Sequence, residues 1–169
     1  MSTSKRLVWL DLEGTIIESW YNTKLINIEK IKDLLDRFGV TEIGIFSFAI
    51  YNQTDITKFN DEVKGRIESA LGVDVVAVPS VIDMMNADFR FTNVHWEKGL
   101  EIHDFIAVRT KVGAFEHYIR VGYDEDTYAL LIDDVVPNQT ITDLDNNVVV
   151  DYLNVNHGEF DALRLQWHV

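Results

Sequence analysis

Residues 7–15 read Leu-Val-Trp-Leu-Asp-Leu-Glu-Gly-Thr, and this stretch decides the fold more than any other part of the chain. The apolar run before Asp11 does not alternate with polar residues, which is typical of a strand buried on both faces of a parallel sheet. Such strands carry ligand-binding groups at their carboxyl ends, where this one has Asp11 and Glu13. Gly14 follows and permits a tight turn. We therefore expect a central strand that ends in a functional site.

A second stretch of the same kind lies at residues 128–134, which read Tyr-Ala-Leu-Leu-Ile-Asp-Asp. Its last two residues, Asp133 and Asp134, can meet the acids of the first stretch only if the two strands are neighbours. Four carboxylates in one crevice repel one another unless a cation compensates their charge. Because carboxylate oxygens of this kind suit magnesium, the two stretches together predict a Mg²⁺ site.

The rest of the chain alternates between helical and extended patterns. We predict helices at about 27–38, 55–71 and 111–121, and further strands at 42–48, 73–78, 105–108 and 148–153. This alternation predicts an α/β fold with a doubly wound, mostly parallel, Rossmann-like sheet. Residues 1–169 are expected to form a single domain. Since only residues 16–41 separate the first two strands, no large cap domain fits between them.

The composition argues against several classes of function. The chain has no cysteine, so it can form neither a disulfide nor a thiolate metal site. Its net charge of −13 at pH 7 repels phosphate backbones, and no basic run is longer than Lys5-Arg6, so long nucleic acid is an unfavourable partner. We find no signal segment and no apolar run of membrane-spanning length, and we expect a cytoplasmic protein. The sequence leaves the oligomeric state open.

Four stretches resemble, in the right order, the motifs of the haloacid dehalogenase (HAD) superfamily. Residues 11–15 resemble the first motif, whose usual form is Asp-x-Asp-Gly-Thr, and Ser47 at a strand end resembles the second. Lys111 at the start of a predicted helix resembles the third, and residues 130–134 resemble the fourth. The resemblance implies a HAD-like core. It also implies a magnesium-dependent phosphohydrolase, a phosphomonoesterase of nucleotidase-like type that forms an aspartyl-phosphate intermediate.

The same resemblance implies catalytic roles for three residues. Asp11 would attack phosphorus and form the aspartyl-phosphate. Glu13 would protonate the leaving oxygen and then activate water, while its backbone carbonyl would bind the metal. Lys111 would neutralise charge on the nucleophile and on the phosphate.

The other residues of the motifs would hold the substrate and the metal. Ser47 would donate a hydrogen bond to a phosphoryl oxygen, and Gly14 and Lys111 would complete the phosphate site. Asp133 would bind Mg²⁺ directly or through water, and Asp134 would be a further ligand or would hold the lysine. Asp11 and Glu13 would complete the set of metal ligands.

Two details of the motifs stay open. Most phosphatases of this family have Asp where this chain has Glu13, although members of the enolase-phosphatase type carry Asp-x-Glu-Gly-Thr and are active. The longer side chain keeps acid/base chemistry available but leaves the rate and the substrate class undecided. Lys98 competes with Lys111 for the third motif. We prefer Lys111 because its helix leads directly into the strand at 128–134.

Residues 80–110 are the least regular part of the sequence and could supply a small lid or an irregular insertion. Four residues of this segment could lie near a substrate ring or could fill the edge of the core: Phe89, Phe91, His95 and Trp96. Without a large cap, the site would be open, and it would fit a small phosphorylated substrate such as a nucleotide.

Two other classes of function remain as alternatives. Asp11 and Glu13 also resemble the Asp-x-Glu motif of DEDD-type 3′–5′ exonucleases, which use two metal ions, and residues 157–161 resemble a degenerate final motif of that class. Against this, the segment after Glu13 leads to a helix rather than a strand meander, and the strand at 128–134 has no role in such a nuclease. A non-catalytic binding protein on a HAD scaffold is the third class, because a fold does not fix a function.

Overall fold

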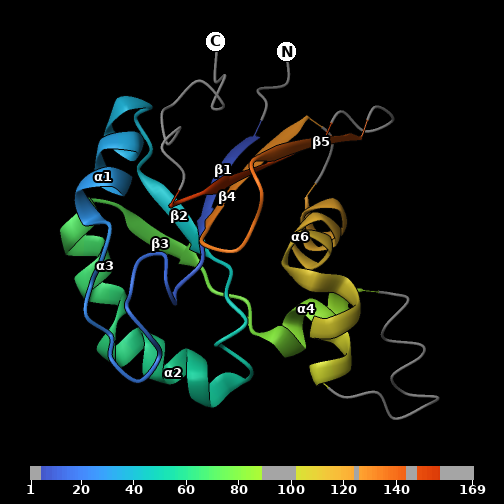
Figure 1. The fold of residues 1–169 in the computed structure, drawn as a ribbon, viewed down its shortest axis with the longest axis horizontal. Helices are drawn as coiled ribbons and strands as arrows, with labels where there is room; N and C mark the ends of the chain where they lie inside the picture. Colours follow the sequence, from blue (N-terminus) through green and yellow to red (C-terminus); the bar gives the residue numbers. More distant parts are fainter. Residues whose placement is uncertain (1–4, 89–101, 124–125, 144–147, 157–169) are drawn as a thin grey trace.

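The computed structural model describes residues 5–88, 102–123, 126–143 and 148–156. In this part of the chain, six strands form one sheet in the order β3-β2-β1-β4-β6-β5 (Figure 1). The strands are β1 (Lys5–Leu10), β2 (Glu42–Ile45), β3 (Asp74–Ala77), β4 (Thr127–Asp133), β5 (Gln139–Asp143) and β6 (Val148–Asn154). All neighbours run parallel except β5, which pairs antiparallel with β6 at the edge. The predicted α/β fold with a mostly parallel sheet is confirmed, and the described residues contain no large cap.

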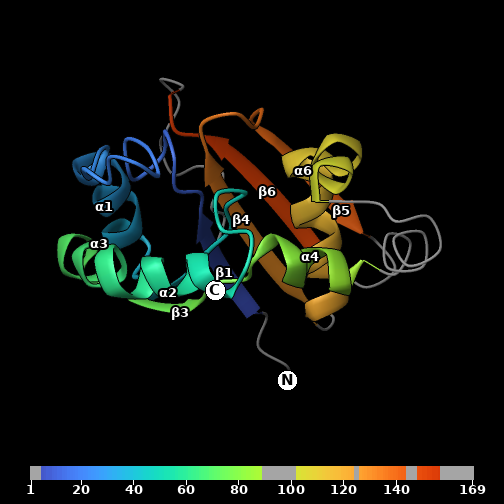
Figure 2. The ribbon, with the colours of Figure 1, turned by 90° about the horizontal axis from the view of Figure 1, so that it is seen from below.

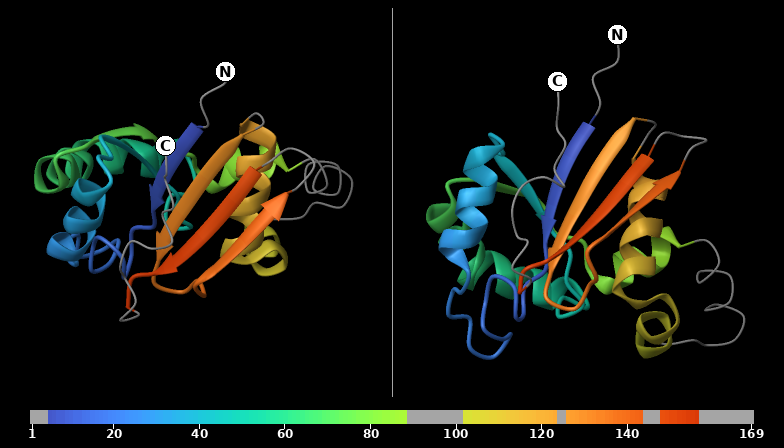
Figure 3. Two further views of the ribbon diagram at one scale, coloured as in Figure 1. Left: turned by 90° about the horizontal axis from the view of Figure 1, so that it is seen from above. Right: turned by 45° about the horizontal axis from the view of Figure 1, so that its top comes forward.

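Helices cover both faces of this sheet, as expected for a doubly wound fold (Figures 2 and 3). They are α1 (Ile28–Arg37), α2 (Gln53–Glu62), α3 (Lys64–Leu71), α4 (Val81–Ala87) and α6 (Ile102–Gly122). Side chains alternate along β1: Val8 and Leu10 join the apolar cluster beneath α1 and α3, whereas Trp9 joins the cluster beneath α4 and α6. The uninterrupted apolar run of β1 therefore serves two cores, one on each face.

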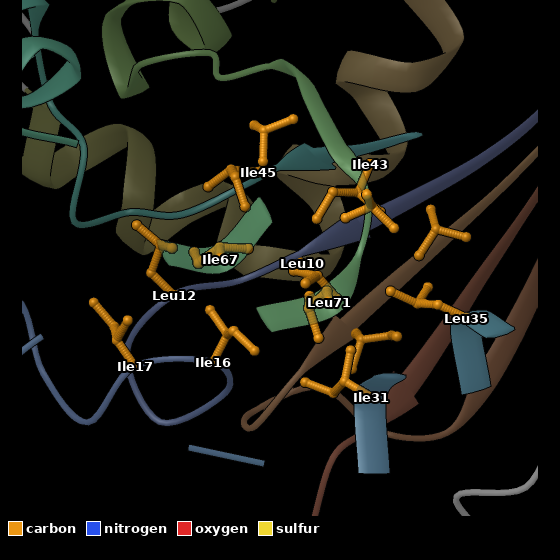
Figure 4. Packing of buried hydrophobic residues seen from close by; sticks show 14 of the residues in the cluster. Leu10, Leu12, Ile16, Ile17, Ile31, Leu35, Ile43, Ile45, Ile67 and Leu71 are labelled. Atoms are coloured by element: carbon orange, nitrogen blue, oxygen red, sulfur yellow. The ribbon is translucent and has the colours of Figure 1, made fainter. Parts of the chain in front are cut away.

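The loop after β1 is part of the first core. Leu12, Ile16 and Ile17 are completely buried, and they belong to the same cluster as Ile31 of α1 and Ile67 of α3 (Figure 4). Along the chain, residues 13–15 thus have a buried residue directly before them and two directly after them. This packing holds the segment in place at the carboxyl edge of the sheet.

Gly44 in β2 makes room for the indole of Trp9 in the second core. A Cβ atom at this position would lie 2.3 Å from Trp9 Cε3, far closer than packed atoms approach. The indole also makes edge-to-face contacts with Phe46 and Phe115, so it has little freedom to move away.

We therefore expect Gly44→Ala to lower the free energy of unfolding by about 1–3 kcal/mol, the usual cost of overpacking a core. Gly65→Ala is the matched control, because a Cβ at Gly65 in α3 would meet nothing within 4 Å. That change should be neutral or slightly stabilising, by up to about 1 kcal/mol. Urea denaturation of the two variants measures the difference. Equal unfolding free energies of the two variants would show that the Trp9 indole does not need the space that Gly44 leaves.

Two predicted elements differ from the structure, and one strand was not predicted. The helix predicted over 55–71 is two helices, since the backbone turns at Val63 (φ −124°, ψ −43°) between α2 and α3. The strand predicted at 105–108 is wrong: these residues are helical and belong to α6. The sequence reading also missed β5, which is a short edge strand.

The segment 80–110 is only partly described. Residues 81–87 form α4 and residues 102–110 form the first part of α6. The aromatic residues predicted near a substrate ring (Phe89, Phe91, His95 and Trp96) lie outside the described residues. Among the helices that are described, none is long and apolar enough to cross a membrane.

Candidate functional site

The carboxyl ends of β1 and β4 lie side by side. Leu10 pairs with Ile132 in parallel register, and the Asp11 N–H donates a hydrogen bond of 3.0 Å to the Ile132 carbonyl. Asp11 and Asp133 therefore leave neighbouring strands at the same level. One carboxylate oxygen from each of Asp11, Asp133 and Asp134 lies within 4.8 Å of the others. Three of the four predicted acids thus meet at one point.

Lys111 lies between two of these acids. Its Nζ atom is 2.8 Å from Asp11 Oδ1 and 3.0 Å from Asp133 Oδ2, and all three side chains are buried. One buried cation is thus shared by two carboxylates that come from different strands. Lys98, the other candidate for this role, lies outside the described residues.

A break in α6 places Lys111 at this position. Thr110 interrupts the helix with φ 60° and ψ 176°, a backbone conformation that β-branched residues rarely adopt. Such strain persists only where the surrounding structure enforces it. A new helical segment starts directly after the break, so Lys111 opens it, as the sequence predicts for residues 111–121.

The ionisation of the group follows from burial and crowding. Burial raises the pKa of Asp11 and Asp133 adds to this effect, while Lys111 opposes it. Burial alone would lower the pKa of Lys111, but Asp11 and Asp133 together raise it, so the ammonium stays protonated. Partial burial and the nearby Asp11 and Asp133 raise the pKa of Asp134 to about 7. One lysine therefore does not fully offset the burial and mutual repulsion of these carboxyl groups.

Gly14 lets the third acid approach the loop after β1. Its φ of +74° is in the left-handed region, and a Cβ atom there would lie 2.2 Å from Asp134 Oδ2. The glycine is thus required for two separate reasons, namely its backbone conformation and the space that it leaves for the carboxylate.

We expect Gly14→Ala to destabilise the protein by more than the strain of a positive φ, which costs about 1–2 kcal/mol. Gly39→Ala isolates that strain, since Gly39 has φ +63° and a Cβ there would meet nothing within 4 Å. Gly14→Ala should therefore lose more unfolding free energy than Gly39→Ala. This additional loss should become smaller when Asp134 is also changed to Ala, as measured in a double-mutant cycle. Strictly additive effects would contradict the proposed clash.

Two hydroxyl side chains border the acids. Ser47 follows β2 on the other side of β1 and is almost completely buried, and its Oγ accepts a hydrogen bond of 3.1 Å from the Ala49 N–H. Among the residues that the structure describes, no acceptor takes its hydroxyl proton, so the hydroxyl could donate to a ligand. Thr15 is buried as well, and its Oγ1 lies 3.5 Å from Asp11 Oδ2, at the limit of a hydrogen bond.

Glu13 takes a different position from the other acids. Its side chain is exposed, and its Oε2 accepts a hydrogen bond of 2.9 Å from the Trp20 N–H. Its carboxylate is not part of the group formed by Asp11, Asp133 and Asp134. The predicted metal contact of Glu13 through its backbone carbonyl stays a prediction.

These groups line one open cleft with a volume of about 720 Å³. The cleft brings together five of the residues predicted for the site: Asp11, Glu13, Ser47, Lys111 and Asp134. Asp133 lies behind them and is completely buried. Residues that follow β1, β2 and β4 thus converge with residues of α6 at the carboxyl edge of the sheet, where ligands bind in folds of this type.

The sequence reading missed the aromatic residues of the cleft. Its walls also contain Trp20, Tyr21, Phe48 and Tyr51, and the strained Thr110. In the sequence, Trp20 and Tyr21 come soon after the first motif, and Phe48 directly follows Ser47. This closeness to the motifs along the chain could have identified them as candidate site residues.

No family model, curated protein or solved structure matches the chain. These comparisons support no family assignment, and the HAD resemblance stays a prediction from the sequence motifs. The fold itself is a Rossmann-like α/β domain with five parallel strands and one antiparallel edge strand.

Proposed function

We propose that the protein is a magnesium-dependent phosphohydrolase of the HAD type, acting on phosphate monoesters through an aspartyl-phosphate intermediate. The observation that carries the proposal is the buried Lys111 ammonium between Asp11 and Asp133, with Asp134 beside them, at the carboxyl ends of two central parallel strands. The resemblance assigns the same residues to the nucleophile, the lysine and the metal ligands.

The side chains fit a magnesium ion. One oxygen from each of Asp11, Asp133 and Asp134 lies close enough to share one cation, and a bound cation would relieve the repulsion that helps raise the pKa of Asp11 and Asp134. Mg²⁺ prefers a small number of carboxylates and completes its shell with water and phosphate oxygens. When bound, the ion would neutralise the phosphate and favour attack at phosphorus.

Asp11 would act as the nucleophile. Lys111 donates to its Oδ1 over 2.8 Å and favours the ionised form, which burial disfavours. Attack of a carboxylate oxygen of Asp11 on phosphorus would break the bond to the leaving oxygen and give an acyl phosphate. The Ser47 hydroxyl and the Lys111 ammonium would donate hydrogen bonds to the phosphoryl oxygens, and such contacts stabilise the charge that these oxygens carry during transfer.

Glu13 would act first as the general acid and then as the general base. Its carboxyl lines the same cleft but lies outside the acid cluster, so it can give a proton to the leaving oxygen without competing for the lysine. In the second step, the carboxylate would take a proton from the water that hydrolyses the acyl phosphate. The hydrogen bond from the Trp20 N–H orients the side chain for both steps.

The exonuclease alternative is less well supported by this geometry. It requires Asp11 and Glu13 to share two metal ions, whereas the carboxylates that join Asp11 come from the end of β4. β1 and β2 are parallel and connected through α1, which differs from a strand meander. Residues 157–161, which would supply its final motif, lie outside the described residues.

The role of Glu13 can be tested through the leaving group. We expect wild-type protein to release phosphate from p-nitrophenyl phosphate and from alkyl phosphates such as glycerol phosphate only with Mg²⁺. Glu13→Gln should reduce the rate on the alkyl phosphate by roughly 100-fold or more. The rate on p-nitrophenyl phosphate should fall less, because a stable leaving anion needs little help from an acid.

Two outcomes would contradict this proposal. If Glu13→Gln slows both substrates equally, Glu13 does not act as the acid. If wild-type protein releases no phosphate from any monoester, the protein is a binding protein on this fold or a different enzyme. Glu29→Gln is the matched control, because Glu29 is an exposed acid of α1 that is not part of the cleft wall.

A further inference from the structure

The cleft continues from the acid cluster into an aromatic wall. Phe48 connects the two parts: its ring centre lies 4.9 Å from Lys111 Nζ, a cation–π contact. Beyond it, Tyr51 follows β2, while Trp20 and Tyr21 come from the loop after β1. A ligand held at the lysine would therefore extend along aromatic side chains.

The wall exposes apolar surface that a folded protein usually covers. Tyr21 is 96% exposed, Val135 is 71% exposed and Tyr51 is 39% exposed, and all three border this cleft. Exposed apolar side chains that line one cleft together with polar groups are typical of ligand-binding sites. The volume of about 720 Å³ is in the range of small-molecule pockets.

The loop that carries Trp20 and Tyr21 is held in place before any ligand binds. We call residues 18–24 the flap: its ends are joined by a hydrogen bond of 2.9 Å from the Glu18 N–H to the Lys24 carbonyl. Lys58 of α2 donates to the Trp20 carbonyl over 2.8 Å, and its Nζ lies 4.5 Å from the centre of the Trp20 ring. A side chain that is already oriented loses little conformational entropy on binding.

A second cation anchors the flap near its C-terminal end. Arg66 of α3 donates to both the hydroxyl and the carbonyl of Thr23, over 3.1 Å and 2.9 Å. In Figure 1, the blue loop after β1 accordingly lies beside α2. The flap thus has two anchors on the helices of one face of the sheet, and its aromatic residues line the cleft.

The flap also contacts the acid/base residue. The Trp20 N–H is the donor to Glu13 Oε2, so the residue that would meet a ring also orients the carboxyl that would protonate the leaving oxygen. Recognition of the leaving group and proton transfer therefore depend on the same backbone segment.

We propose that the aromatic wall formed by Trp20, Tyr21, Phe48 and Tyr51 is a leaving-group subsite for phosphate monoesters whose alcohol carries a planar aromatic ring. This proposal rests on the phosphohydrolase function proposed above. Nucleoside 5′-monophosphates and aryl phosphates both have this chemistry, with the ring at different distances from phosphorus. Stacking of a base on an aromatic side chain contributes about 1–3 kcal/mol, which corresponds to roughly five- to 150-fold in affinity.

The kinetic test compares substrates with and without a ring. We expect wild-type protein with Mg²⁺ to have a kcat/KM for AMP at least roughly tenfold above that for ribose 5-phosphate, which has a similar leaving alcohol but no base. Trp20→Ala and Tyr51→Ala should each lower this ratio by roughly fivefold or more, toward one, and Trp20→Phe should keep most of it. Val76→Ala, an exposed apolar change on β3 away from the cleft, should leave the ratio unchanged. A ratio near one in wild type, or an unchanged ratio in both alanine variants, would overturn the subsite.

A binding test separates this proposal from the phosphohydrolase function. Calorimetry on full-length Asp11→Asn with Mg²⁺ compares AMP, phenyl phosphate and ribose 5-phosphate, and does not depend on turnover. Tighter binding of AMP or phenyl phosphate, lost when Trp20→Ala is added, supports the subsite even if wild-type protein hydrolyses nothing. Equal binding of all three ligands overturns the subsite and leaves the phosphohydrolase proposal standing if phosphate is released. If only one of AMP and phenyl phosphate binds more tightly than ribose 5-phosphate, the subsite is supported and the preferred class of ring-bearing ester is identified.

Discussion

Asp11→Asn should abolish magnesium-dependent phosphate release, with a loss of roughly 10⁴-fold or more, because it removes the nucleophile and not merely a contact to the substrate. The amide has the same shape as the carboxylate but is a far weaker nucleophile. Release of phosphate is followed for wild type and variant under identical Mg²⁺ concentrations.

The same variant should fold normally. Lys111 would keep its ion pair with Asp133 at 3.0 Å, and the amide oxygen of the substituted side chain could still accept a hydrogen bond from the lysine. We therefore expect a thermal unfolding midpoint close to that of wild type. Asp36→Asn, which changes an exposed acid paired with Lys32, is the matched control and should retain full activity. Activity of Asp11→Asn within roughly tenfold of wild type would exclude Asp11 as the nucleophile.

Lys111→Met should have the largest effect on stability. The change leaves Asp11 and Asp133 facing each other in a buried site without their shared cation. Removing one partner of a buried ion pair costs about 3–5 kcal/mol, because the remaining charges have lost their solvation and their counter-charge. Urea denaturation measures the loss, and phosphate release should disappear along with it.

The matched control for this change is Lys32→Met. Lys32 also forms an ion pair at 2.7 Å, with Asp36, but both side chains are about half exposed. Such surface pairs contribute up to about 1 kcal/mol. A comparable loss in both variants would show that the buried position of Lys111 has no special importance. If Lys111→Met is as stable as wild type and active, the lysine is not part of the site.

The central strands and their acids could be predicted from sequence because local patterns specify them. Apolar runs without polar alternation require burial on both faces, and this places β1 and β4 in the middle of a parallel sheet. Their adjacent positions then bring Asp11 and Asp133 together. Apolar spacing is likewise a local property, so it located α1 and the helical segment that Lys111 opens to within a few residues.

The sequence could not specify contacts that depend on how distant segments pack. Lys111 is 100 residues away from Asp11, and its entry into the site requires the break at Thr110, which no local pattern predicts. The apolar residues at 105–108 fit a strand as well as a helix, because short apolar runs do not distinguish the two. The edge strand β5 was missed for a related reason: it is short and follows a polar turn.

The aromatic wall shows the same limitation. Trp20 and Tyr51 stand beside the motifs in sequence, but their common position in one cleft results from the anchoring of the flap by Lys58 and Arg66. These cations lie on helices that are far from the first motif in the chain. The leaving-group side of the site could therefore be recognised only in the folded structure.

The most direct test of the account is to trap the covalent intermediate. Wild-type protein is mixed with p-nitrophenyl phosphate and Mg²⁺, quenched in acid within the first turnover, digested and examined by mass spectrometry. The account predicts an acid-stable, hydroxylamine-sensitive phosphoryl group on the peptide that contains Asp11, and none in Asp11→Asn. Phosphate release by wild-type protein with no phosphoryl group on that peptide, or with the group on another residue, would contradict it.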